Sequence, residues 1–214
     1  MLERAHLRGD LRAALKSAPD MERALARLSL GRGGPRDLMA MRLGLEAARA
    51  IKACLLAPKD ALEDMPDLVA DAATDLGDHD TLITELTQAL VEEPPLLTRD
   101  GGFIRKGYNA ALDEFRVLKD ESRRLIAGLE SDYQKLTGIN ALKVKHNNVI
   151  GYHVDVTAKH ADKMLSAPLS ETFIHRQTLA NSVRFSTSEL SKLAGKISEA
   201  GDRALSLEQE LFSG

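Results

Sequence analysis

Two short stretches in the second half of the chain combine cationic side chains with neutral hydrogen-bond donors. The first, LKVKHNNVIGYHVDV, spans residues 142–156, and the second, HRQTLANSVRF, spans residues 175–185. Lysine and arginine attract phosphate groups, while asparagine and threonine donate hydrogen bonds to phosphate oxygens, so that such residues hold a protein on a nucleic-acid backbone without reading its sequence. The candidate residues for such contacts are Lys143, Lys145, Asn147, Asn148, Arg176, Thr178, Asn181 and Arg184.

The same lysine pattern has a second interpretation, because lysine on a strand often only solvates a face or protects an edge from pairing with another chain. Charge distribution bears on the choice. The formal net charge is −3, but residues 60–93 hold eleven acidic side chains and no lysine or arginine, whereas residues 131–190 hold seven lysines and arginines against five acidic residues. A polyanion should prefer the second segment, and its small surplus of positive charge predicts weak, salt-sensitive binding.

Other chemistries find little support in the residue pattern. The sequence has no phosphate loop, no dinucleotide-binding glycine motif, no paired cysteines and no nucleophile-elbow or zinc-protease motif. Four of the six histidines fall between residues 131 and 190, but without the spacing of metal ligands. Cys54 is the only cysteine, which excludes an internal disulfide, and we expect it to be a small buried apolar residue. We therefore expect no catalytic residues and no metal site.

The first half of the chain has the pattern of several helices. Apolar residues recur at helical spacing over residues 10–30, with a break at Pro19, and again over residues 35–56, where Pro35 suits a first helical turn. No apolar run approaches the ~18 residues of a membrane span, and the first ten residues lack the apolar core of a secretory signal. We expect a multi-helical body and no contact with a membrane.

Two later segments carry the spacing of long helices with one apolar face. In the first segment this face comprises Ala111, Phe115, Leu118, Ser122, Leu125, Leu129, Asp132 and Leu136. In the second it comprises Leu190, Leu193, Ile197, Ala200, Ala204, Leu207 and Leu211. Gly138 should end the first helix, and Ser186 should cap the second with Glu189 reaching back. The economical arrangement is an antiparallel pair whose intervening residues form a head at one end.

The head should contain an antiparallel sheet. A three-residue loop, residues 146–148, places Leu142 opposite Tyr152 and Val144 opposite Ile150, and it separates an apolar face from a face that bears both lysines and Asp155. Residues 171–185 should complete the sheet, and the side chains expected to cover its apolar face are Phe173, Leu179, Val183 and Phe185. The predicted fold class is mainly α: a multi-helical core and two long antiparallel helices, with a small antiparallel β-sheet inserted at their tip.

Four blocks of the sequence closely resemble successive blocks of the MutS family of bacterial DNA mismatch-repair proteins. They are ALARLSLGRGGPRDLMAMR, EEPPLLTRDGGFIRKGYNAALDEFRVL, TGINALKVKHNNVIGYHVDV and HRQTLANSVRFSTSEL, in the order of that family. The resemblance implies a discontinuous core or lever domain, residues 1–137 and 188–214, with a clamp domain, residues 138–187, inserted into it. It implies that the clamp grips the backbone of duplex DNA non-specifically and that the levers couple it mechanically to a distant ATPase.

The resemblance also carries two family motifs onto this chain. The K-V-x-x-N…G-Y pattern falls at Lys143, Val144, Asn147, Gly151 and Tyr152. The R-Q-T-L-x-N-x-x-R pattern falls at Arg176, Gln177, Thr178, Leu179, Asn181 and Arg184. The family's Phe-x-Glu mismatch-binding motif and its ATP-binding phosphate loop are missing, so we interpret the chain as a piece of a longer protein that is not itself an enzyme.

The implied partners follow from the same resemblance. They are the backbone of double-stranded DNA and, in the full-length protein, a second subunit, while the chain itself should be monomeric or weakly associating. ATP and magnesium belong to the full-length family, and no cofactor is expected here. The expected location is the bacterial cytoplasm, in association with the nucleoid. The alternative is a protein-interaction or purely structural helical arm that does not bind DNA on its own.

Overall fold

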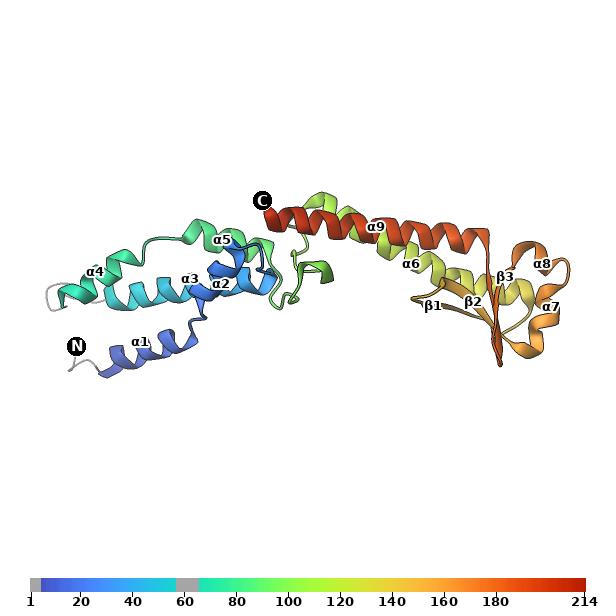
Figure 1. Cartoon of the computed structure of the whole chain (residues 1–214), viewed down its shortest axis with the longest axis horizontal. Helices are drawn as coiled ribbons and strands as arrows, with labels where there is room; N and C mark the ends of the chain where they lie inside the picture. Colours follow the sequence, from blue (N-terminus) through green and yellow to red (C-terminus); the bar gives the residue numbers. More distant parts are fainter. Residues whose placement is uncertain (1–4, 57–65) are drawn as a thin grey trace. The chain divides into compact units, whose positions relative to one another are not determined.

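The computed structural model describes residues 5–56 and 66–214 (Figure 1). The regular structure of these residues is helical, apart from one four-stranded sheet and one isolated β-bridge. Residues 60–65 of the acidic segment lie outside this described part. The chain divides into two units, the first comprising residues 1–108 and 208–214 and the second residues 109–207. The division into residues 1–137 with 188–214 and an inserted clamp, residues 138–187, stays a prediction.

The first unit contains the predicted multi-helical body. Its elements are α1 (Ala5–Ser17), α2 (Met21–Ser29), α3 (Pro35–Leu56), α4 (Asp67–Asp75), α5 (Asp80–Ala89) and the 3-10 helix η1 (Thr98–Asp100). The break at Pro19 is present, and the Asp20 carboxylate caps α2 by accepting the Arg23 amide at 3.0 Å. Pro35 begins α3 as predicted, because its missing N–H costs nothing in a first turn. Cys54 is half-buried rather than buried, which corrects the expectation for it.

The second unit contains the long helices and the sheet. Its elements are α6 (Ala110–Thr137), β1 (Lys143–Asn147), β2 (Gly151–Thr157), the 3-10 helix η2 (Ala158–His160), α7 (Ala161–Leu165), α8 (Leu169–Thr172), β3 (Ile174–Thr178), β4 (Ser182–Ser186) and α9 (Ser188–Ser213), of which residues 208–213 belong to the first unit. The strand order is β1-β2-β4-β3, and every neighbouring pair is antiparallel. The predicted fold class is thereby confirmed. No helix in the described part of the chain is long and apolar enough to cross a bilayer.

The two long helices run antiparallel, since residues early in α6 meet residues late in α9. The Arg203 guanidinium lies over the Phe115 ring at 5.9 Å, while the Tyr133 hydroxyl lies 2.6 Å from that of Thr187. The predicted apolar face of α9 is correct, but that of α6 is rotated. Its buried side chains are Leu112, Ser122, Ile126, Leu129, Tyr133 and Thr137, whereas Ala111, Leu118, Leu125, Asp132 and Leu136 are exposed. Gly138 ends α6 with φ +65°, as expected.

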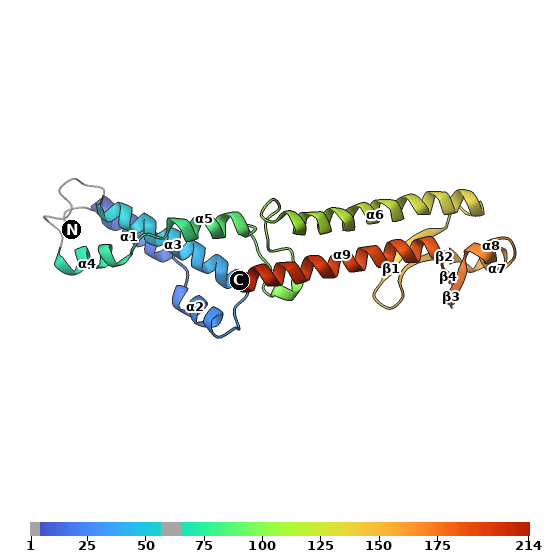
Figure 2. The ribbon, with the colours of Figure 1, turned by 90° about the horizontal axis from the view of Figure 1, so that it is seen from above.

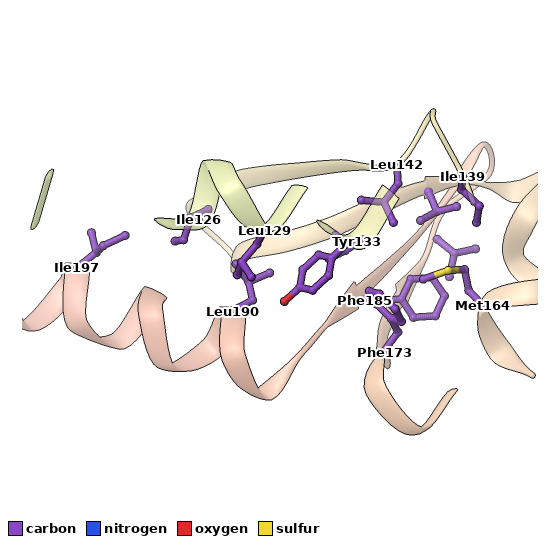
Figure 3. Close-up of a cluster of buried hydrophobic side chains, with 13 residues drawn as sticks. Ile126, Leu129, Tyr133, Ile139, Leu142, Met164, Phe173, Phe185, Leu190 and Ile197 are labelled. Carbon is purple, nitrogen blue, oxygen red and sulfur yellow. The ribbon is translucent and has the colours of Figure 1, made fainter. Parts of the chain in front are cut away.

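One apolar cluster joins the sheet to both long helices (Figure 3). Ile126, Leu129 and Tyr133 enter it from α6, and Leu190 and Ile197 from α9. The sheet and its connections contribute Leu142, Val154, Val156, Met164, Phe173, Val183 and Phe185. Phe173, Val183 and Phe185 cover the apolar face as predicted, while Leu179 lies in a turn and remains 36% exposed, so its predicted role is wrong. The cluster fixes the head on the two helices.

The N-terminal cap of α9 is Thr187 and not Ser186. The Leu190 amide donates to the Thr187 hydroxyl at 3.0 Å, and that hydroxyl also meets the Tyr133 hydroxyl of α6. Ser186 instead ends β4, and its hydroxyl lies 3.0 Å from that of Ser191. The cap lies one residue later than predicted because β4 continues through Ser186. The next hydroxyl, that of Thr187, therefore accepts a free amide of the first helical turn.

The β1–β2 hairpin has a different register from the one predicted. Val144 pairs with Val154, and Asn147 pairs with Gly151, so that the turn is residues 148–150 instead of 146–148. The two registers differ by an even number of residues, so each strand residue keeps its predicted face. Leu142, Val154 and Val156 are fully buried on the apolar side, and both lysines lie on the other side.

Candidate nucleic-acid interface

The two hairpin turns of the sheet lie at opposite ends. The β1–β2 turn, residues 148–150, lies at the end where β4 passes into α9, which we call the near end. The β3–β4 turn, residues 179–181, lies beside η2 at the opposite end, which we call the far end, and the Ala158 amide donates to the Asn181 carbonyl there at 3.1 Å. Figure 2 shows the β1–β2 turn directed back toward α9. The eight candidate residues therefore cannot all form one tip.

Lys143 is held by a carboxylate of α6. Its ammonium nitrogen donates to Glu130 Oε1 at 2.9 Å, and the other oxygen of Glu130 accepts the Val144 amide at 2.9 Å. One turn later the Gln134 side chain donates to the Leu142 carbonyl at 2.8 Å. Two side chains at i and i+4 on α6 thus satisfy backbone groups on the free edge of β1, which protects that edge from pairing with another chain.

Lys145 is held by a carboxylate of the neighbouring strand. Its ammonium nitrogen donates to Asp155 Oδ1 at 2.9 Å. The second oxygen of Asp155 accepts the Ser182 hydroxyl at 3.3 Å and lies 3.6 Å from the Arg184 guanidinium. Because the Asp155 side chain is only 13% exposed while that of Lys145 is 55% exposed, the aspartate is fixed in the sheet and the lysine reaches it from solvent.

These contacts lower the pKa of both carboxyl groups. For Glu130 the main cause of the lowered pKa is the hydrogen bond from Lys143, followed by that from the Val144 amide. For Asp155 partial burial is the largest influence and raises the pKa, but the hydrogen bonds and charges of Lys145, Ser182 and Arg184 together outweigh it and lower the pKa. Both groups therefore stay ionised in the folded chain at any pH near neutrality.

This lowering of two pKa values predicts a loss of stability in acid. A carboxyl group whose pKa is lower in the folded state stabilises the fold above its unfolded pKa, about 4, and this contribution is lost as the pH falls through the folded value. We expect the thermal melting midpoint to fall between pH 6 and pH 3, and to fall less in the double variant Glu130→Gln, Asp155→Asn. Equal pH profiles of the two proteins, measured by circular dichroism, would contradict the assignment.

The two asparagines of the first hairpin have different roles. Asn147 builds the turn, since its side-chain oxygen accepts the amides of Val149 and Ile150 at 2.9 and 2.8 Å. Gly151 follows at φ +70°, a conformation that side chains other than glycine rarely adopt. Asn148 is exposed at the near end, beside Val149, which is 91% exposed. Only Asn148 is therefore available to an external group.

The candidate residues of the second hairpin also differ in whether they are available to an external group. Arg184 is engaged, because it donates to the Gln177 side chain at 2.9 Å and lies beside Asp155, with only 23% of its side chain exposed. Arg176 is the extra residue of a bulge in the edge strand β3 and is exposed, without an ion pair among the described residues. Thr178 bonds the His175 ring at 2.9 Å, and the Asn181 side chain is exposed at the far end.

Lys159 is a cation that the motif pattern did not single out. It follows β2 directly, in η2, where the chain is bonded to the β3–β4 turn, and its side chain is exposed without a partner in the described part of the chain. The signal in the sequence was its position just beyond the alternating stretch of residues 142–156. The far end thus combines Lys159 with Thr178 and Asn181, and Arg176 lies along the adjacent edge.

The arrangement suits the binding of an extended anion. Its cationic and amide side chains, those of Lys159, Arg176 and Asn181, are exposed to solvent at the end and along the edge of the sheet. Within residues 5–56 and 66–214, no group of three or more His, Cys, Asp or Glu side chains is placed to hold a metal ion. His153 is buried in β2, where its Nδ1 lies 2.9 Å from the Gly151 carbonyl.

Comparison with known proteins points to one family. Residues 107–203, which nearly coincide with the second unit, match the model described as MutS family domain IV. The chain is 55% identical over 212 residues to the DNA mismatch repair protein MutS of Ruegeria pomeroyi and 54% identical over 211 residues to that of Dinoroseobacter shibae, covering 99% of this chain and 24% of each relative. It is 53% identical over 213 residues to that of Paracoccus denitrificans, with 100% and 24% covered. The chain spans about a quarter of the length of these relatives.

Proposed function

Because the chain belongs to the MutS family, we propose that it serves DNA mismatch repair by binding the backbone of duplex DNA through the sheet of its second unit. The contacts are made to phosphate groups and are independent of base sequence. The chain contributes binding and mechanical coupling and has no catalytic activity of its own.

The observation that carries this proposal is the set of unpaired, exposed polar groups at the far end of the sheet. Lys159 and Arg176 supply positive charge without an ion pair in the described part of the chain, and Asn181 supplies a neutral donor. Thr178 adds a hydroxyl that bonds only its own strand's histidine. Groups of this kind, spread along an edge, match the repeated phosphates of a nucleic-acid strand.

Mechanical coupling is supported by the way in which the sheet is joined to the long helices. Glu130 and Gln134 of α6 bond the edge of β1, and Thr187 links β4, α9 and Tyr133 of α6. The apolar cluster that the sheet shares with α6 and α9 lies at the same junction. We propose that a displacement of the sheet on DNA is passed to both helices, because a packed joint moves as a body.

A second chain would strengthen weak binding. One sheet offers few unpaired cations, so its own affinity should be low and strongly salt-dependent. We propose that a second subunit places another such sheet on the same duplex, which raises the effective affinity through avidity without any new kind of contact.

The binding test is fluorescence anisotropy of the chain with labelled 30-base-pair duplexes of unrelated sequence, over a series of salt concentrations. We expect the same affinity for each duplex. The logarithm of the association constant plotted against the logarithm of the salt concentration should have a slope of about −1 to −3, as a few phosphate contacts would give. Absence of salt-sensitive binding at low ionic strength, or a clear preference among duplexes, would contradict the proposal.

A protein-interaction arm is the second candidate function, favoured by the exposed apolar side of α6. Val117, Leu118 and Leu125 are 48%, 44% and 59% exposed there. Under this alternative the chain would bind another protein saturably and would show no salt-dependent affinity for duplex DNA, so the same anisotropy series separates the two functions.

A further inference from the structure

Two carboxylates, Glu130 and Asp155, form ion pairs with Lys143 and Lys145, the lysines that the sequence pattern assigns to phosphate contacts. Each carboxylate has one oxygen fixed by the fold and presents the other oxygen to a lysine. Glu130 is fixed by the Val144 amide, and Asp155 by Ser182 and the nearby Arg184. This shared geometry holds both acceptors in place before any ligand arrives.

The lysines are less firmly held than their partners. Both lysine side chains are 55% exposed, whereas those of Glu130 and Asp155 are 26% and 13% exposed. An ion pair open to solvent on one side is weak, because water and salt screen it. A lysine can therefore leave its carboxylate for a phosphate, but the carboxylate stays behind and its negative charge opposes the phosphate.

We infer that these two carboxylates, Glu130 and Asp155, limit the affinity of the sheet for DNA phosphates by competing for its two lysines. The inference rests on the proposed function and identifies two residues that reduce the contribution of Lys143 and Lys145 to binding. While its pair is closed, each lysine has a carboxylate within ion-pair distance that offsets its positive charge, so that lysine releases few counterions from DNA. Removing the carboxylate charge converts the lysine into a full phosphate contact.

The test compares conservative variants of the chain with a control of equal charge change. Glu130→Gln keeps an oxygen for the Val144 amide and removes the charge. Asp155→Asn does the same beside Lys145. Glu171→Gln is the control, because Glu171 is exposed in α8 of the same unit and has no lysine partner in the described part of the chain. Thermal melting of each variant checks that the fold is kept.

We expect Glu130→Gln and Asp155→Asn each to tighten duplex binding by about three- to tenfold at low salt and to steepen the salt slope by up to about one. The control variant should change affinity less, since it alters only the distant field of the protein. The gain from Asp155→Asn should disappear in a chain that also carries Lys145→Gln, because no lysine is left to release. The gain from Glu130→Gln should disappear likewise with Lys143→Gln.

The outcomes separate this inference from the proposed function. If the chain binds duplex DNA but both variants gain no more than Glu171→Gln, or keep their gain after the lysine is removed, the inference is wrong and the function stands. If neither the chain nor any variant binds, both are wrong. Binding seen only in Glu130→Gln or Asp155→Asn, and lost again with the lysine, supports both.

Discussion

Replacing Phe185 by alanine is expected to lower the free energy of unfolding of the second unit by about 3–5 kcal/mol. Phe185 lies on the inner strand β4, is fully buried and pairs with Val154 across the sheet. Its ring belongs to the cluster that joins the sheet to α6 and α9, and it also packs edge-on against the exposed His175 ring of β3, with ring centroids 5.9 Å apart. Alanine leaves a cavity at this joint, which neighbours on rigid strands cannot fill.

Urea denaturation followed by circular dichroism measures this loss, with Val149→Ala as the matched control. Val149 is 91% exposed in the β1–β2 turn, so its truncation removes no buried contact and should change the free energy of unfolding by less than about 0.5 kcal/mol. If Phe185→Ala cost no more than about 1 kcal/mol, the cluster would not be the joint that we describe.

Reversing the charge of the two unpaired cations at the far end is expected to weaken binding to duplex DNA by about 100-fold at low salt. The variant is Lys159→Glu, Arg176→Glu. Both side chains are exposed and have no ion pair in the described part of the chain, so each substitution removes an attraction to phosphate and adds a repulsion. Neither residue is buried, so the fold should be unaffected.

The control for this reversal is Lys192→Glu, Lys196→Glu, which changes the charge equally. Both lysines are exposed on α9, which leaves the sheet at its near end. Anisotropy at several salt concentrations should show a loss of affinity and a slope reduced by about two for the far-end variant, and a smaller, non-specific loss for the control. Equal losses would mean that net charge, and not the far end of the sheet, governs binding.

The hairpin illustrates what period-two alternation can predict. Alternation assigned Leu142, Val154 and Val156 to the buried face and Lys145 to the other face, and the structure confirms each. The register was wrong because alternation is unchanged when pairing shifts by an even number of residues. The turn position was decided by Asn147, whose side chain accepts two turn amides, an interaction that no count of apolar residues contains.

The long helix α6 illustrates the limit of helical spacing. A seam through Leu118 and Leu125 and a seam through Ile126 and Tyr133 fit the sequence about equally well, since both repeat every three or four residues. The structure buries the second, because Ile126 and Tyr133 meet the sheet and α9, while the two leucines face outward. Choosing between them required knowing where the sheet lies.

By itself the sequence determined which segments form helices and strands, and which side of each β1–β2 strand is apolar. Local periodicity, proline and glycine positions, and the turn before each helix set the helices, the strands and the mainly α fold, because these signals act within a few residues. It also identified the cationic candidates and their family resemblance, down to the lysines and Arg176.

Only the tertiary structure decided which of those cations are available. Glu130 reaches Lys143 from another element, and Asp155 meets both Lys145 and Arg184 across neighbouring strands. The same packing separated the two turns and brought Lys159 beside Asn181 at the far end. An ion pair depends on a distance of a few ångströms between residues far apart in the chain, and only the folded arrangement fixes such a distance.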